Sequence, residues 1–183
     1  YREYMQGDPI ERIDWNVYAR TDKYVIRRFH DEVSIRANIL LDTSESMAFQ
    51  NGGPVSKMDY GCQLAAALMF VMIHQGDSAS LITIDDDLRK TYEPASTLGG
   101  MRPMLEGLEE IVPKGTSDLE KSLSKATEFI KGRSMVVIIS DLLQDPRETL
   151  KGIGSLVYAG HDVTLFHVLD PVEIRLPNAG LIE

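Results

Sequence analysis

The chain has 183 residues, 43% of them hydrophobic, and a formal net charge of −9. This length suits one domain of ordinary size with a sizeable core. Residues 1–36 carry seven basic and seven acidic side chains, whereas residues 37–183 carry twelve and twenty-one. Because such a surface repels phosphate backbones, the charge argues against nucleic acid as the main partner.

Cysteine content and hydropathy narrow the class of protein further. The single cysteine, Cys62, excludes an internal disulfide and a cysteine-based zinc site, and its apolar surroundings favour a buried side chain over a nucleophile. The longest apolar run, residues 64–73, is too short to span a bilayer. The chain starts at Tyr1 rather than methionine, so we expect it to be a piece of a longer protein.

The first part of the chain is rich in charged and aromatic residues. We interpret residues 1–35 as an N-terminal extension and residues 36–183 as a domain. Residues 24–29 have the composition of an edge strand. Trp15 is interpreted as a packing anchor. We interpret Arg12, Asp14 and Arg20 either as an internal ion-pair network or as a docking face.

Strand and helix patterns alternate from residue 37 onward. Apolar runs predict buried parallel strands at residues 38–42, 79–84, 135–139 and 163–168, and a short edge strand at 88–92. Caps and periodicity predict helices at residues 57–75, 101–111, 117–132 (with a capping box from Ser117 to Glu120) and 145–160. The alternation implies an α/β fold, a three-layer Rossmann-like arrangement with a mostly parallel sheet and helices on both faces.

Three local features carry further expectations. The helix at residues 57–75 is apolar nearly all round, so we expect it to be largely buried. The adjacent carboxylates at residues 85–87 predict a solvated hairpin turn rather than a calcium loop, whose ligands alternate around a glycine. His167, inside the last strand, is expected in the core.

Oxygen-bearing side chains end two of the predicted strands. Asp42 ends the first, with Ser44 and Ser46 following, and Asp141 follows the strand at 135–139. In open α/β sheets, ligands bind at the carboxyl ends of the strands. Thr116 follows a glycine just before a helix, where its hydroxyl can reach the same edge. Since such donors suit magnesium, we predict a metal site made of Asp42, Ser44, Ser46, Thr116 and Asp141.

These motifs resemble two related groups of proteins. Asp42-Thr43-Ser44-Glu45-Ser46, the Gly115-Thr116 step and Asp141 resemble the metal-ion-dependent adhesion site of von Willebrand factor A-like domains, over residues 37 to about 170. A second resemblance is to the bacterial uncharacterised-domain family numbered fifty-eight. It rests on Tyr4-x-x-Gly7-Asp8-x-x-x-Arg12-Ile13-Asp14-Trp15, then Ala19-Arg20, Ser140-Asp141-Leu142 and His167-Val168-Leu169-Asp170-Pro171.

The resemblance implies a von Willebrand factor A-like fold after a short β-rich extension. It implies that Ser44, Ser46 and Thr116 contact Mg²⁺ (or Mn²⁺ or Ca²⁺), with Asp42 and Asp141 acting mostly through water. Neutral ligands leave much of the ion's charge uncompensated, so an acidic side chain of a protein partner can complete its coordination. Members are often encoded beside MoxR-type AAA+ ATPases and resemble membrane-tethered proteins. We therefore expect an AAA+ ATPase partner and a cytoplasmic location, with any membrane tether in segments absent from this chain.

Three functions follow from this pattern, and we favour the first. It is a non-catalytic, divalent-metal-dependent protein-interaction module that works with a MoxR-type AAA+ ATPase in the assembly or maturation of other proteins. The second is a magnesium-dependent phosphohydrolase with Asp42 as nucleophile, although Ser44 stands where the haloacid-dehalogenase pattern needs a second acid. The third is a structural A-domain with a vestigial metal site.

Overall fold

The computed structural model describes residues 2–5, 8–26 and 34–174, although the side chains of Arg2 and Arg12 are outside that description. The chain divides into two units, Tyr1–Val33 and Ser34–Glu183. In the first unit, β1 (Arg2–Glu3) pairs with β2 (Val25–Ile26) in antiparallel orientation. A short 3₁₀ helix (Ile10–Arg12) and α1 (Trp15–Thr21) lie between these strands in the sequence.

The first unit tests several predictions. The predicted edge strand is confirmed at Val25–Ile26, and its remaining residues 27–29 lie outside the described residues. Asp14 accepts hydrogen bonds from the N–H groups of Asn16 and Val17 and so caps α1. The prediction that Trp15 is a packing anchor is wrong, because its side chain is 54% exposed and makes an edge contact with Tyr18.

A five-stranded sheet forms the centre of the second unit, in the order β5-β4-β3-β6-β7. β3 pairs in parallel with β4 and β6, and β6 pairs in parallel with β7, whereas β5 is an antiparallel edge strand. The strands are β3 (Arg36–Asp42), β4 (Ser78–Ile84), β5 (Leu88–Thr91), β6 (Met135–Ser140) and β7 (Asp162–His167).

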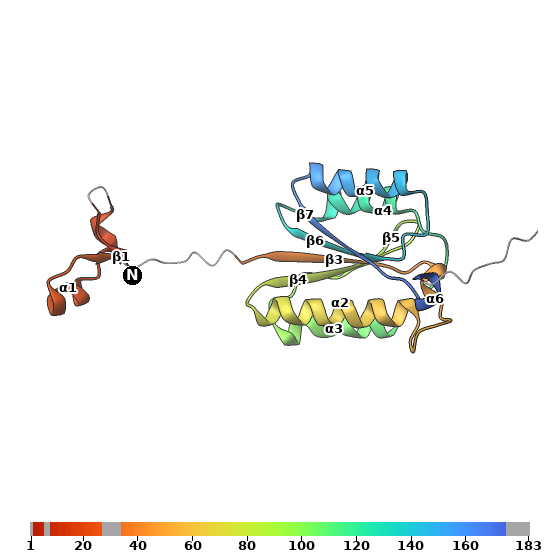
Figure 1. The fold of residues 1–183 in the computed structure, drawn as a ribbon, viewed down its shortest axis with the longest axis horizontal. Helices are drawn as coiled ribbons and strands as arrows, with labels where there is room; N and C mark the ends of the chain where they lie inside the picture. The colour runs from red at the N-terminus through yellow and green to blue at the C-terminus, as the bar shows by residue number, and fades with distance from the viewer. Residues whose placement is uncertain (1, 6–7, 27–33, 175–183) are drawn as a thin grey trace, which may run out of the picture. The chain divides into compact units, whose positions relative to one another are not determined.

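Helices cover both faces of this sheet, which confirms the predicted three-layer fold (Figure 1). One face carries α2 (Lys57–His74) and α3 (Leu98–Glu109), and the other carries α4 (Leu119–Phe129) and α5 (Pro146–Tyr158). A 3₁₀ helix, η2 (Glu45–Ala48), follows β3, and the short α6 (Pro171–Ile174) follows β7. Because β3 is central, its residues from Ala37 to Asp42 are all buried.

The core consists of two apolar layers, one on each side of β3. Ile39 and Leu41 pack with the layer that contains Met69 of α2. Leu40 packs with the opposite layer, which contains Leu123 of α4. Alternate β3 side chains therefore support helices on opposite faces, as the pleat of a strand requires.

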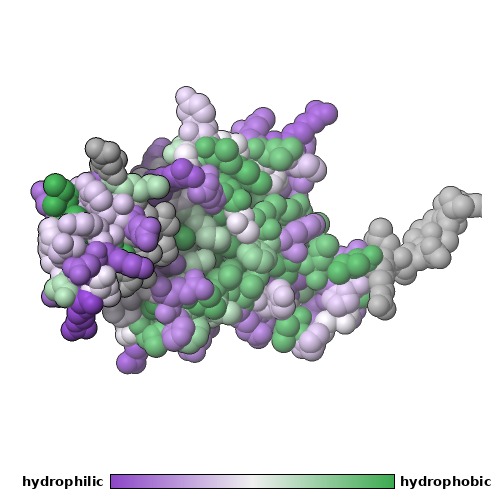
Figure 2. Space-filling view, turned by 60° about the vertical axis from the view of Figure 1, so that its left-hand side comes forward, coloured by the Kyte–Doolittle hydropathy of each residue, from purple (hydrophilic) through white to green (hydrophobic). Residues whose placement is uncertain are grey.

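The helix α2 differs from its prediction, because only one side of it is buried. Its buried apolar side chains recur every three or four residues, whereas Phe70 and Val71 are 48% and 45% exposed. Figure 2 likewise shows hydrophobic residues beside hydrophilic ones on the surface of the second unit. The expectation of burial all round is wrong, because α2 lies on one face of the sheet and only one stripe of it meets the strands.

Two other expectations about polar residues have different outcomes. The predicted hairpin turn at residues 85–87 is confirmed between β4 and β5, but only part of it is solvated: Asp86 is 51% exposed, whereas Asp85 is 1% exposed and contacts Arg89. Asp87 pairs with Lys121 and Lys125. His167 is exposed rather than in the core, because β7 is an edge strand. Its Nε2 lies 3.0 Å from the carbonyl oxygen of Asp141.

Two helices begin at residues other than those predicted, because other side chains cap them. α3 begins at Leu98 rather than at Met101, since the Thr97 side chain accepts a hydrogen bond from the N–H of Gly100. α4 is capped by Asp118, not by the predicted Ser117. The predicted start of α5 at Asp145 is confirmed.

Asp170 joins the loop before α2 to the start of α6. Its buried carboxylate accepts hydrogen bonds from the backbone N–H groups of Asn51, Gly52, Gly53 and Val172. Burial alone would raise the pKa of Asp170, but these donors hold the pKa below its usual value. The ionised carboxylate therefore stabilises this junction.

The pH dependence of stability tests that role. A lowered pKa stabilises the fold above the unfolded value of about 3.9, and this stabilisation is lost as pH falls through the folded value. At neutral pH the wild type should melt at a higher temperature than Asp170→Asn, and the difference should shrink in acid. The control Asp162→Asn, at a 70% exposed side chain, should change the melting temperature little. A difference for Asp170→Asn that persists unchanged in acid would contradict this role.

Candidate metal centre

Asp42 ends β3 with a carboxylate that has no exposed surface. Its Oδ1 accepts a hydrogen bond from the N–H of Ser44 at 3.0 Å. Its Oδ2 accepts hydrogen bonds from the hydroxyls of Ser140, at 2.6 Å, and Ser117, at 3.2 Å. This carboxylate therefore joins the end of β3 to the end of β6 and to the segment before α4.

The two predicted serine ligands lie together on the loop that follows Asp42. The hydroxyl oxygens of Ser44 and Ser46 are 3.1 Å apart, at the start of η2. Backbone hydrogen bonds attach this loop to the segment before α4, from the N–H of Glu45 to the carbonyl of Gly115 and from the N–H of Lys114 to the carbonyl of Thr43. Segments about 70 residues apart in the chain are thereby held side by side.

Thr116 lines the same cavity as the two serines. An open cavity of about 710 Å³ is lined by Ser44, Ser46 and Thr116, among other residues. Gly115 has a φ of +75°, a left-handed conformation that glycine adopts without strain and that directs the chain past the serine loop. Three hydroxyl-bearing residues thus line one cavity at the carboxyl edge of the sheet.

Asp141 has a different set of contacts. Its Oδ2 lies 2.8 Å from Nζ of Lys57, and both side chains are almost fully buried. Nζ of Lys57 also lies 2.9 Å from Oε1 of Glu173 in α6 and 5.4 Å from the centre of the Phe49 ring. Asp141 does not line the cavity of the three hydroxyls. The ammonium group therefore supplies a positive charge to one of the two predicted carboxylates.

The two buried carboxylates differ in their electrostatic environment. Burial raises the pKa of Asp42, while hydrogen bonds from Ser140 and Ser44 lower it only in part, and the charge of Asp141 raises it further. For Lys57, burial lowers the pKa, but Asp141 and Glu173 more than offset this and the pKa rises. Lys57 is thus held in its charged form, whereas the hydrogen-bond donors to Asp42 given above are all neutral.

The sequence interpretation missed three residues of this site: Ser117, Ser140 and Lys57. Ser140 had a usable signal in the sequence, because it directly follows the apolar run of β6 as Asp42 follows that of β3. The register pairs Leu41 with Ile139 and so places Ser140 next to Asp42. Ser117 was assigned to a helix cap by its spacing. Lys57 had no signal, since a lysine at the first position of a helix is ordinarily exposed.

Clusters of the usual charged, imidazole and thiol metal ligands were also considered for the described residues. Residues 2–5, 8–26 and 34–174 contain no group of three or more His, Cys, Asp or Glu side chains placed to hold a metal ion. Cys62 packs partly buried against the core, and burial, then the charge of Asp59, raises its pKa to about 11. The serine loop with Asp42 is therefore the candidate metal site.

Comparison with known proteins places the chain in a family. The model of the family described as "Protein of unknown function DUF58" matches residues 1–183. The chain belongs to this family. Uncharacterized proteins of Mycobacterium bovis and Mycobacterium tuberculosis are 27% identical to it over 183 residues. That alignment covers 98% of this chain and 56% of each relative, so this DUF58 chain spans about half the length of the curated relatives it matches.

Solved structures support the fold. BatB from Bacteroides thetaiotaomicron has a TM-score of 0.59 and 20% identity, covering 72% of this chain and 65% of that one. An aerotolerance-related membrane protein from Bacteroides fragilis has a TM-score of 0.60 and 23% identity, covering 72% and 66%. The VWA domain of SpRpn10 has a TM-score of 0.51 and 15% identity, covering 73% and 74%. The DUF58 chain therefore has a von Willebrand factor A-like fold.

The described helices are short or polar relative to a membrane span. None of the helices within residues 2–5, 8–26 and 34–174 is long and apolar enough to cross a bilayer.

Removing the charge of Lys57 tests the buried ion pair. Lys57→Met leaves Asp141 buried beside no cation, which should destabilise the fold by about 3–5 kcal/mol. Adding Asp141→Asn should recover part of that loss, by about 1 kcal/mol or more, because the two side chains interact directly. Urea unfolding of the single and double variants measures both effects.

The matched control for this cycle is Lys151→Met. Lys151 pairs with Glu120 at 3.2 Å but is 65% exposed, so its replacement should cost less than about 1 kcal/mol. If Lys57→Met were no more destabilising than this control, the ion pair would not be the support for Asp141 described above.

Proposed function

We propose that this chain is a non-catalytic protein-interaction module whose binding depends on a divalent cation, Mg²⁺ in the first instance. Ser44, Ser46 and Thr116 would contact the ion, and Asp42 would support it from behind. An acidic side chain of a partner protein would complete the coordination. The observation that carries the proposal is the fully buried carboxylate of Asp42. It accepts a hydrogen bond from the N–H of Ser44, whose hydroxyl lies 3.1 Å from that of Ser46.

The electrostatics of Asp42 support a cation at this place. Burial of a carboxylate costs free energy unless a positive charge or sufficient donors offset it. The donors described for Asp42 are one backbone amide and two serine hydroxyls, and its pKa is raised. A cation beside the serine loop would reduce this cost, and bound in that position it would supply positive charge to attract an anion.

The donor set fits magnesium better than a transition metal. Hydroxyl and carboxylate oxygens suit hard divalent cations, which keep some of their water in protein sites. Manganese and calcium share this preference for oxygen, so either could replace magnesium in a binding assay.

Lys57 shapes what the ion would attract. Because its ammonium already neutralises Asp141, Asp42 is the carboxylate that remains to balance a divalent ion from within the domain. An ion held largely by neutral hydroxyls keeps much of its charge. That charge favours an external carboxylate, which supports an interaction role for the site.

The position of Asp42 also supports a non-catalytic role. A nucleophilic carboxylate needs an oxygen that can reach a substrate. Asp42 has no exposed surface, and hydrogen bonds occupy both of its oxygens. The phosphohydrolase alternative therefore receives no support from this geometry.

The choice of partner rests on family resemblance alone. From it we propose an AAA+ ATPase of the MoxR type, acting with this chain in the assembly or maturation of other proteins, and a cytoplasmic site of action. Any membrane anchor would belong to segments outside this sequence.

Metal binding is tested by thermal unfolding. At a concentration 100 times the dissociation constant, magnesium should add about 2.7 kcal/mol of stability and raise the melting temperature by about 5–10 °C. The rise should vanish in the double variant Ser44→Ala/Ser46→Ala, which loses two of the three hydroxyls. Ser96→Ala, at an exposed loop serine, is the control and should respond as the wild type does.

Two results would count against the metal site. One is a melting temperature that neither Mg²⁺ nor Mn²⁺ raises at millimolar concentration, which would favour a vestigial site. The other is an equal rise in the wild type and the double serine variant, which would place the ion elsewhere on the chain.

The partner proposal is tested by affinity capture from a lysate of the source organism. An AAA+ ATPase should be retained in magnesium, and lost in chelator and with Ser44→Ala/Ser46→Ala. Retention that is independent of magnesium and of both serines would contradict a metal-dependent interaction.

A further inference from the structure

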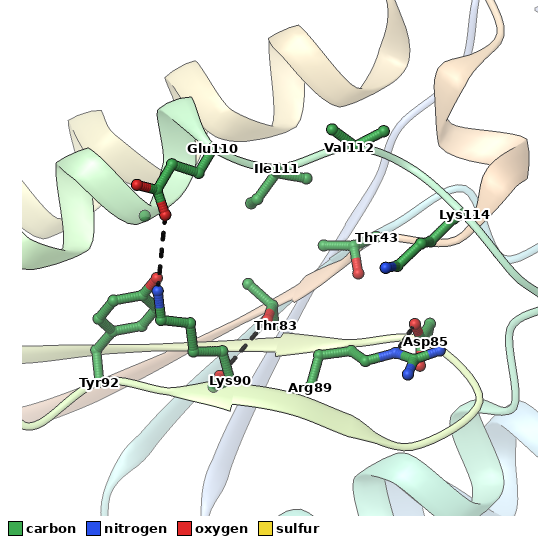
Figure 3. A pocket seen from close by; sticks show the side chains of 11 residues that line it. Thr43, Thr83, Asp85, Arg89, Lys90, Tyr92, Glu110, Ile111, Val112 and Lys114 are labelled. Atoms are coloured by element: carbon green, nitrogen blue, oxygen red, sulfur yellow. Dashed lines mark hydrogen bonds and ion pairs between the residues drawn. The ribbon is translucent and has the colours of Figure 1, made fainter.

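A second cavity lies next to the candidate metal centre. It has a volume of about 330 Å³ and lies between β4, β5 and the segment that follows α3 (Figure 3). Its lining includes Thr43 and Lys114, which directly precede Ser44 and Gly115 of the candidate metal centre. These two lining residues are joined by the hydrogen bond from the N–H of Lys114 to the carbonyl of Thr43.

The second cavity gathers positive charge on a protein whose net charge is −9. Three cations line it, from Arg89, Lys90 and Lys114, with two carboxylates, from Asp85 and Glu110. The region is therefore locally cationic, within a domain that is otherwise acidic. An excess of positive charge in a cavity attracts anionic groups.

The three cations differ in how far they are already paired. Arg89 contacts Asp85 and lies 3.1 Å from Asp86, and Lys90 lies 4.8 Å from the centre of the Tyr92 ring and 3.9 Å from Glu110. Within the described residues, no carboxylate lies within ion-pair distance of Lys114. Figure 3 shows its side chain extending over the cavity toward Thr43. Lys114 is thus the cation left to bind an incoming anion.

Arg89 connects the cavity to the candidate metal centre. A Cβ atom built on Gly115 would lie 3.7 Å from Nη2 of Arg89, so the guanidinium approaches the turn that also lines the metal site. The two cavities are also adjacent along the chain, because Thr43 and Lys114 line one while Ser44 and Gly115 line the other. One short peptide could therefore reach both.

We infer that the partner recognised by this chain is an acidic peptide segment with two carboxylates, one for the metal ion and a second for Lys114. This inference rests on the proposed function, because the first carboxylate needs the ion. A single unpaired ammonium suits a singly charged carboxylate. The exposed Val112 and the half-buried Ile111 at the same cavity provide apolar contact for the residues between the two acids.

The experiment uses synthetic peptides as probes. One set carries two glutamates separated by zero to five Gly or Ser residues, and a reference peptide carries one glutamate. In magnesium, at one spacing, the two-glutamate peptide should bind about fivefold tighter than the reference, the gain from one partly exposed charge pair. Titration of ¹⁵N-labelled protein should shift the amide signals of Ser44 and Lys114 together.

Variants assign the two contacts. Lys114→Met should remove the fivefold gain and leave the binding of the one-glutamate peptide unchanged. The control Lys131→Met, at an exposed lysine that lines the different cavity beside Arg36, should keep the gain. Ser44→Ala/Ser46→Ala should abolish the binding of both peptides, as should a chelator.

The outcomes separate this inference from the proposed function. Binding of the one-glutamate peptide in magnesium, with less than about a twofold gain at every spacing, overturns the inference and keeps the metal-dependent function. A gain that survives Lys114→Met also overturns it. If neither peptide binds in magnesium, both fail together.

Discussion

The carboxylate of Asp42 is the group on which the carboxyl edge of this sheet depends. It has no exposed surface, and it accepts hydrogen bonds from the serine loop, from the segment before α4 and from the end of β6. Loops at the end of a parallel sheet have no continuous ladder to hold them, so individual backbone and side-chain hydrogen bonds fix their positions. Asp42 provides that contact for three segments at once. Its contacts with Ser44 and Ser117 hold the residues next to Ser46 and Thr116.

Charge at this edge is divided between two carboxylates with different partners. Asp141 has an internal counter-ion in Lys57, which also pairs with Glu173 and so joins the edge of the sheet to α6. Asp42 has neutral donors. A buried ion pair fixes geometry more than it adds stability, because desolvation offsets much of the attraction. Lys57 holds Asp141 in place; under the proposed function, Asp42 would balance a bound cation, and the surplus charge of that cation would select an acidic partner.

Sequence patterns were sufficient where a structure depends on local order. The apolar runs of β3 and β6 and the Asp145 cap of α5 are local signals, and each was found where predicted. Sequence patterns failed where contacts between distant segments determine the role of a side chain. The spacing of Ser117 fits a cap, yet its hydroxyl bonds Asp42, 75 positions away. Lys57 resembles any exposed lysine at a helix start, and only the packing of α6 and β6 around it makes it buried.

Manganese tests the central claim most directly, because a bound paramagnetic ion broadens the NMR signals of the nuclei nearest to it. In ¹⁵N-labelled protein, a small fraction of Mn²⁺ should broaden the amide signals of Ser44, Ser46 and Thr116 first, and excess Mg²⁺ should reverse the effect. The acidic turn at residues 85–87 is the natural competitor for a cation, although its carboxylates already contact Arg89, Lys121 and Lys125. Broadening centred on that turn, or none at the serine loop, would contradict the account.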